Sequence, residues 1–374
     1  MQKRLALPAI ATAMEKSGLS QASLARELDV SRESVSKWLR GASLPRPEKL
    51  LKLALLLGLR LDELVIREPS ASDPVVAFRK RGASKTTEAH IARAKDTGRL
   101  LRQLVPYLPF DEFLQPGTLK DPTVDYGYVQ RLANRVREDI GVAADDPVDY
   151  GHLIDRFHDT QTVLVPVLWG KKNHHENALH ILLPDSRTTW VFLNLDVEVH
   201  DFKFWMAHEL GHVLAPQLRA NEGEDFADAF AGALLFPELL ASRAYAELKQ
   251  HGNTGQQINR IKDIAEKYLI SPITVYYEIN RRAEHAGDPP LKLEPGIFGA
   301  AKNLSKGYYS VSETLFGEDR PPAADYIAFA RELQSPFFEA LKGFLRDKAK
   351  GPGFIQSVLD IPLWDAREIH AALV

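Results

Sequence analysis

The stretch WMAHELGHVLAP, residues 205–216, decides the fold of the larger part of this chain. His208 and His212 stand four residues apart, so on a helix both imidazoles lie on one face, about one turn apart, and can reach a single ion. Glu209 follows the first histidine and would reach a water molecule bound beside that ion. Apolar residues on the other side of the stretch predict burial, and Gly211 permits a neighbouring backbone to approach closely.

Two neutral imidazoles and one carboxylate are a common ligand set for a catalytic zinc ion, whose fourth position stays open to water. Zinc lowers the pKa of that water, and we expect Glu209 to take its proton as general base and to pass it to the leaving amine. The same ligand types also suit Mn²⁺ or Fe²⁺, so the metal is not fixed by the sequence. The chain has no cysteine, which excludes thiolate metal sites, disulfides and a cysteine nucleophile.

A third ligand is expected from NEGEDFADAFAGALLFP, residues 221–237, which has the pattern of a second helix. Glu224 and Asp228 share one face of this helix at positions i and i+4. If the helix packs across the first, it would present Glu224 to the ion, with Asp228 behind it to orient a ligand imidazole. Acidic residues are also common at a helix start because they complement the helix dipole, so the spacing alone leaves both interpretations open.

The order HELGH, then E-x-x-A-D-x-F-A-x-x-L-L-x-P, resembles the ImmA/IrrE family of bacterial metallopeptidases, and the resemblance covers about residues 125–285. It implies that Glu224 is the third ligand and Glu209 the catalytic base. The family often has Asn where this chain has Asp228. Members typically cleave transcriptional repressors or related regulators and so release stress, mobile-element or defence genes. The resemblance therefore implies a repressor or antitoxin-like protein as the substrate.

The N-terminal part contains a second pattern, GLSQASLARELDVSRESVSKWLRG at residues 18–41. Ser20 and Ser31 are each placed to cap a helix, with Asp29 and Val30 in the turn between the two helices. The second helix is basic and suited to the major groove of DNA. The order Q-x-x-L-A-x-x-L-x-V-S-R-x-x-V-S-x-W-x-x-G resembles the phage-repressor (XRE) type of helix-turn-helix.

That second resemblance implies a set of DNA contacts. Base contacts are implied for Arg32, Glu33, Ser36 and Lys37, and phosphate contacts for Gln21 and Arg40. Residues 1–52 carry ten basic and five acidic side chains in a chain whose net charge is −3, which favours a polyanion partner for this part alone. Because such modules bind paired half-sites, we expect a double-stranded DNA operator and a homodimer. The alternative is a helical protein-interaction domain that does not bind DNA.

The length of 374 residues predicts two or three domains, and the fold class is α+β and mostly helical. We expect a five-helix DNA-binding domain at 1–66, a linker and helical connector at 67–122, a zincin-like metallopeptidase domain at 123–285, and a mainly helical C-terminal region at 286–374. A small three-stranded sheet is predicted from the runs at 162–169, 178–184 and 188–195. The cluster KKNHHEN, with His174, His175 and Glu176, is interpreted as a polar hairpin turn between strands, and the alternative is a role in a substrate cleft or a further metal site.

No stretch approaches the roughly 18 apolar residues that span a bilayer, and the N-terminus does not have the pattern of a signal peptide. We therefore expect a cytoplasmic protein without a membrane partner. Two functions fit the motifs. In the first, a zinc-dependent endopeptidase cuts a regulatory protein while the helix-turn-helix binds promoter DNA. In the second, the chain is a transcription factor whose metal domain is a sensor or scaffold without turnover. Glu209 favours the first, because a scaffold needs no general base.

Overall fold

The computed structural model describes residues 2–68, 73–79, 87–110, 118–170, 178–317 and 320–374. The chain divides into two compact units, Met1–Asp73 and Pro74–Val374, and each is described by itself. The cluster at 171–177, with its predicted polar turn, lies outside the described residues. No helix in the described part of the chain is long and apolar enough to cross a membrane.

The first unit contains the five predicted helices around a small apolar core. They are α1 (Leu7–Lys16), α2 (Gln21–Glu27), α3 (Arg32–Leu39), α4 (Pro47–Leu57) and α5 (Leu61–Leu64). Ser20 caps α2 and Ser31 caps α3 through their side-chain oxygens, as the sequence predicts. A two-stranded ladder that the sequence did not suggest joins β1 (Gln2–Leu5) to β2 (Val65–Glu68) and brings the ends of this unit together.

The sheet of the second unit has four strands, which corrects the predicted three. They are β3 (Val75–Arg79), β4 (Val163–Val167), β5 (Ala178–Leu183) and β6 (Thr188–Asn194), in the order β3-β5-β6-β4. Strand β4 runs parallel to β6, and the other neighbours are antiparallel. Strand β3 lies in the stretch assigned to a connector. Its five residues give little local signal, because their hydrogen-bond partner β5 follows about a hundred residues later.

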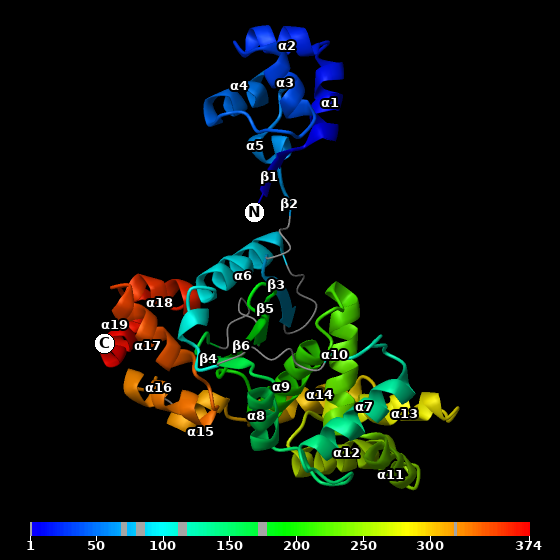
Figure 1. The fold of residues 1–374 in the computed structure, drawn as a ribbon. Helices are drawn as coiled ribbons and strands as arrows, with labels where there is room; N and C mark the ends of the chain where they lie inside the picture. The colour runs from blue at the N-terminus through cyan, green and yellow to red at the C-terminus, as the bar shows by residue number, and fades with distance from the viewer. Residues whose placement is uncertain (1, 69–72, 80–86, 111–117, 171–177, 318–319) are drawn as a thin grey trace. The chain divides into compact units, whose positions relative to one another are not determined.

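Helices from the middle of the chain form one core cluster with one face of this sheet and carry the metal motif (Figure 1). They are α7 (Tyr126–Asp139), α8 (Tyr150–Asp159), α9 (Val199–Leu214), α10 (Ala220–Leu235), α11 (Glu238–Leu248), α12 (Thr254–Tyr268), α13 (Pro272–His285) and α14 (Gly296–Ser305). The short α15 (Val311–Phe316) follows them. Alternate residues of β5 point to opposite faces, so Ala178 joins this core while Leu179 and Ile181 join the core on the other face.

The other face of the sheet is covered by α6 (Glu88–Leu101) together with the last helices of the chain (Figure 1). Those last helices are α16 (Ala323–Glu332), α17 (Phe337–Asp347), α18 (Pro352–Leu359) and α19 (Leu363–Leu373). Phe337 and Phe344 are buried in one core cluster with Trp190 and Phe192 of the sheet. Residues 286–374 are therefore part of the second unit, and the helix in the predicted connector packs beside them.

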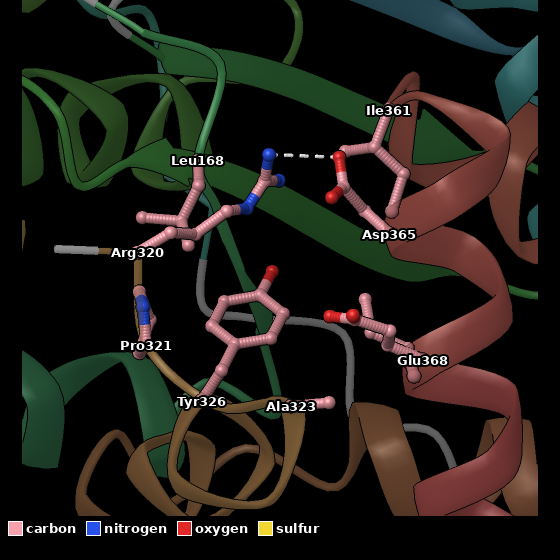
Figure 2. A pocket seen from close by; sticks show the side chains of 9 residues that line it. Leu168, Arg320, Pro321, Ala323, Tyr326, Ile361, Asp365 and Glu368 are labelled. Atoms are coloured by element: carbon pink, nitrogen blue, oxygen red, sulfur yellow. Dashed lines mark ion pairs between the residues drawn. The ribbon is translucent and has the colours of Figure 1, made fainter.

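An ion pair fastens the loop before α16 to the last helix of the chain (Figure 2). Arg320 Nη1 lies 2.8 Å from Oδ2 of the largely buried Asp365. Below it, the hydroxyl of Tyr326 donates to the carbonyl of Pro166 in β4. The cavity between these side chains holds only about 20 Å³, which is close to the space that one water molecule needs. This contact belongs to the packing of α16 and α19 on the sheet.

Glu278 of α13 is a carboxylate buried against α10. It is 2% exposed, and it packs so closely on Gly232 that a Cβ at that position would collide with its carboxylate. Burial raises the pKa of Glu278 to about 7, and Arg281, whose Nη1 lies 2.7 Å from Oε1, offsets only part of the rise. Between the ordinary pKa of 4.5 and about 7, the folded protein holds a proton that the unfolded chain has lost. The free energy of unfolding therefore falls as the pH rises through this range.

We expect Glu278→Gln to stabilise the protein at pH 8 and to change its stability little at pH 5. A shift from 4.5 to about 7 corresponds to roughly 3 kcal/mol in the free energy of unfolding at high pH. Urea unfolding of both proteins at the two pH values measures the difference. Glu284→Gln, at an exposed position of the same helix, is the matched control and should have no pH-dependent effect. An equal effect of Glu278→Gln at both pH values would contradict the shift.

Candidate metal centre and DNA-binding helix

The metal motif lies where α9 and α10 cross. Gly211 of α9 faces Ala227 of α10 so closely that a Cβ at Gly211 would lie 2.9 Å from the Cα of Ala227. The predicted close approach of a neighbouring backbone at Gly211 is therefore confirmed. Such contact between the two helix backbones fixes how far the side chains on their facing surfaces can reach. It brings one turn of α9 and the start of α10 to the same point.

His208 and His212 from α9 converge there with Glu224 from α10. The two Nε2 atoms are 3.1 Å apart, and a Glu224 oxygen lies 3.4 Å from each of them. Ligand atoms around a tetrahedral zinc ion, with bonds of about 2.0–2.1 Å, are about 3.3 Å from one another. Within the described ranges, these residues form the one group of His, Asp and Glu side chains close enough to share a metal ion. Their spacing and their chemistry fit zinc.

Asp228 fixes the tautomer of the first histidine. His208 Nδ1 lies 2.9 Å from Asp228 Oδ1, and because a carboxylate only accepts, Nδ1 carries a proton, so that Nε2 would present its lone pair to the shared point when a metal ion displaces the Nε2 proton. Burial lowers the pKa of His208, but the hydrogen bonds to Asp228 and Glu224 outweigh burial and raise it. Asp228 thus holds the imidazole in the orientation and tautomer that a metal ligand needs, as the sequence suggested.

Three carboxylates, those of Glu209, Glu224 and Asp228, lie close together in the largely buried candidate metal centre. Burial raises the pKa of Glu224, but hydrogen bonds to His208 and His212 outweigh it and hold the pKa well below its ordinary value. Glu209 is 1% exposed, and the side chains of Glu224 and Asp228 are 25% and 27% exposed. Buried carboxylates are stable when a cation or several donors compensate them, so this arrangement favours a bound dication.

Glu209 lies beside the three donors and faces a residue that the sequence analysis missed. His180 of β5 is 4% exposed, and its Nδ1 lies 3.8 Å from Glu209 Oε2. Its ring centroid is 5.7 Å from that of His212. Burial, then the neighbouring His212, lower the pKa of His180 well below its ordinary value, so the ring is neutral. The signal was present, since His180 is one polar residue in the apolar run ALHILLP, but the strand alone does not show what it faces.

Most of the predicted DNA-contacting side chains lie on α3 of the first unit, with Gln21 at the start of α2 and Arg40 at the C-cap of α3. Val35 and Trp38 point into the core, which leaves the opposite face of the helix outward. The exposed residues of the predicted set are Gln21, Arg32, Glu33, Lys37 and Arg40, and Ser36 is half-buried. Lys37 Nζ lies 2.9 Å from Glu33 Oε1, and the Lys37 hydrogen bond and charge lower the pKa of Glu33. If Lys37 contacts DNA, as the sequence predicts, it must exchange this carboxylate for a DNA group.

Comparison with known proteins identifies the first unit. Residues 10–64 match a protein-family model described as helix-turn-helix. The first unit is an XRE-type helix-turn-helix domain. Neither the curated proteins nor the solved structures gave a match to the chain. The chain is therefore a regulator with a DNA-binding helix-turn-helix, which is the part of the predicted function that the comparisons bear out.

We expect Lys37→Ala to weaken binding of the helix-turn-helix domain to DNA by roughly tenfold, because one charged contact to DNA is lost. Lys52→Ala is the matched control. Lys52 forms the same kind of i,i+4 pair, with Glu48 at 3.7 Å, and its side chain is 52% exposed against 53% for Lys37. Titration of the full chain against a duplex selected from a random DNA library measures both affinities. Equal affinities of the two variants would contradict the assignment of Lys37.

Proposed function

We propose that this chain is a DNA-binding transcription regulator with zinc-dependent endopeptidase activity, whose substrate is a repressor or antitoxin-like regulatory protein. The observation that carries the proposal is the convergence of His208, His212 and Glu224 beside the buried carboxylate of Glu209. A metal site that only stabilises a fold is usually closed by a fourth protein ligand. Among the described residues there are three such donors, and the buried carboxylate of Glu209 directly follows His208 in the sequence, which supports catalysis.

The residues have distinct roles in the proposed reaction. His208, His212 and Glu224 would hold the zinc ion, which when bound supplies a Lewis acid for water and for the scissile carbonyl. Glu209 accepts a proton from the attacking water and gives it to the leaving amine. Asp228 keeps His208 in the required tautomer through the 2.9 Å hydrogen bond.

The helix-turn-helix supports a regulatory protein as the substrate. A chain that carries a DNA-binding module acts near promoters, where other DNA-binding regulators gather, and cleavage of such a regulator would change transcription directly. We propose a homodimer for the same reason, because helix-turn-helix modules bind paired half-sites of double-stranded operator DNA. The proposed activity of the second unit is thus linked to the function of the first.

The proposal is tested by identifying the new N-termini that the chain generates when it cleaves proteins in a cell extract. The zinc-loaded full chain is incubated with an extract of cells that lack it, and new N-terminal peptides are identified by mass spectrometry. We expect a small set of cuts in one or a few regulators, lost with a zinc chelator and restored by added zinc. If zinc-loaded and chelated samples give the same N-terminal peptides, the peptidase part of the proposal is wrong.

A further inference from the structure

His180 is a buried polar residue whose place in the sheet has no ordinary structural reason. It lies in β5 between Leu179 and Ile181, which point to the opposite core. His180 lies on the same side of the strand as Ala178, which belongs to the core that also contains residues of α9, and α9 contacts β5. Nδ1 of His180 has no hydrogen-bond partner among the described residues. A buried polar group without a partner costs about 1–3 kcal/mol, so an apolar side chain would stabilise this position better.

The surroundings of His180 indicate the role of its Nδ1 atom. Nδ1 lies 3.8 Å from Oε2 of the Glu209 carboxylate, so an approach of about 0.6 Å brings the two atoms within hydrogen-bond distance. His180 lies outside the group of three that could share a metal ion, although its ring is 5.7 Å from that of His212. Strand β5 is held on both sides, by β3 and β6, so the ring is anchored on a rigid element.

We propose that His180 is a positioning residue that donates its Nδ1–H to one oxygen of Glu209 and so aims the other oxygen at the water that attacks the peptide. This inference rests on the proposed peptidase function. A carboxylate without such a donor can rotate, and neither oxygen is then held in the orientation needed to accept a proton from the water. With one oxygen held from the sheet, the second would be confined to one direction, which under this proposal faces the three metal donors.

The inference is tested with cobalt-loaded protein and acetohydroxamic acid, so no substrate is needed. Cobalt reports its ligands by visible absorption, and the probe binds the metal and gives its acidic proton to a carboxylate beside the metal. His180→Leu removes the donor. His180→Asn restores a donor near the position of Nδ1, whereas His180→Gln places its amide near that of Nε2. Leu182→Val, in the same strand, controls for disturbance of the sheet.

We expect the wild type, His180→Asn and Leu182→Val to bind the probe within about threefold of one another. His180→Leu and His180→Gln should bind it roughly tenfold more weakly, as expected for the loss of one hydrogen bond to a charged group. Cobalt affinity should stay within about threefold in all variants. The double variant His180→Leu/Glu209→Gln should bind no more weakly than Glu209→Gln, because His180 acts only through Glu209.

Three results would overturn the inference: wild-type affinity in His180→Leu, additive losses in the double variant, or loss of cobalt affinity in parallel with loss of probe affinity. If His180→Leu does not fold, the comparison of the Asn and Gln variants decides, and equal affinity of these two contradicts the inference. Failure of the proposed function has a different signature, because the wild type would then not bind one equivalent of cobalt. With cobalt bound and all variants equal to the wild type, only the role of His180 is wrong.

Discussion

Glu209→Gln should reduce cleavage of the protein's substrate by roughly 10²–10⁴-fold, the usual contribution of a general base. Gln has the size of Glu but cannot accept a proton from water, so the shape of the site is kept while its base is lost. Glu209 lies outside the group of metal donors, and we therefore expect zinc affinity to stay nearly unchanged. The domain at residues 10–64 should bind DNA as before.

The measurement is the rate at which the cut N-terminal peptide appears, with zinc content and DNA affinity determined on the same samples. Glu222→Gln is the matched control, since it makes the same chemical change at an exposed position of α10 close to Glu224. Cleavage by Glu209→Gln at the wild-type rate would exclude Glu209 as the base. If this variant loses cleavage but regulates its target genes normally in cells, the metal domain is a sensor or scaffold and not the regulatory enzyme.

Glu224→Ala should lower zinc affinity by at least ~100-fold. Loss of a group that only orients a ligand typically costs 10- to 100-fold in affinity, and Glu224 itself lies 3.4 Å from both imidazole nitrogens. Zinc should also stabilise the wild type against unfolding, by about 4 kcal/mol when its concentration is a thousand times the dissociation constant. Glu224→Ala should lose most of this stabilisation. Competition with a chelating dye and thermal unfolding with and without zinc measure the two effects.

Two further variants make the second prediction specific. Glu222→Ala, two residues before Glu224 in the same helix and exposed, should bind zinc as the wild type does. Asp228→Asn keeps an oxygen that accepts the His208 N–H, so its loss of affinity should be tenfold or less. If Glu224→Ala and Glu222→Ala retain equal zinc affinity, the third ligand is a different residue and the centre must be assigned again.

The parts that were predicted correctly depend on neighbours in the sequence. Ser20 and Ser31 cap their helices within three residues, and the three strand runs form β4, β5 and β6 close to the expected bounds. The pairing of His208 with His212 follows from the helical repeat, because a spacing of four residues places both on one face. Each of these features is encoded within a single turn or strand.

The parts that were missed depend on residues far apart. Strand β3 exists through its pairing with β5, and β1 through its pairing with β2, about sixty residues away. Residues 286–374 had no recognisable motif, yet their last four helices, α16 to α19, cover one face of the sheet because Trp190 and Phe192 need an apolar partner there. A segment that would be unstable by itself shows little pattern, since its stability comes from surfaces elsewhere in the chain.

The sequence by itself determined the helix-turn-helix, two imidazoles on one helix face and a carboxylate beside them, because helix geometry converts a spacing of a few residues into a direction in space. Only the tertiary structure decided that Glu224 meets these imidazoles and that His180 faces Glu209. Both contacts require α9, α10 and β5 to pack at fixed distances, through Gly211 and the sheet. Such distances arise from the sum of many apolar contacts, so no single segment of the sequence determines them.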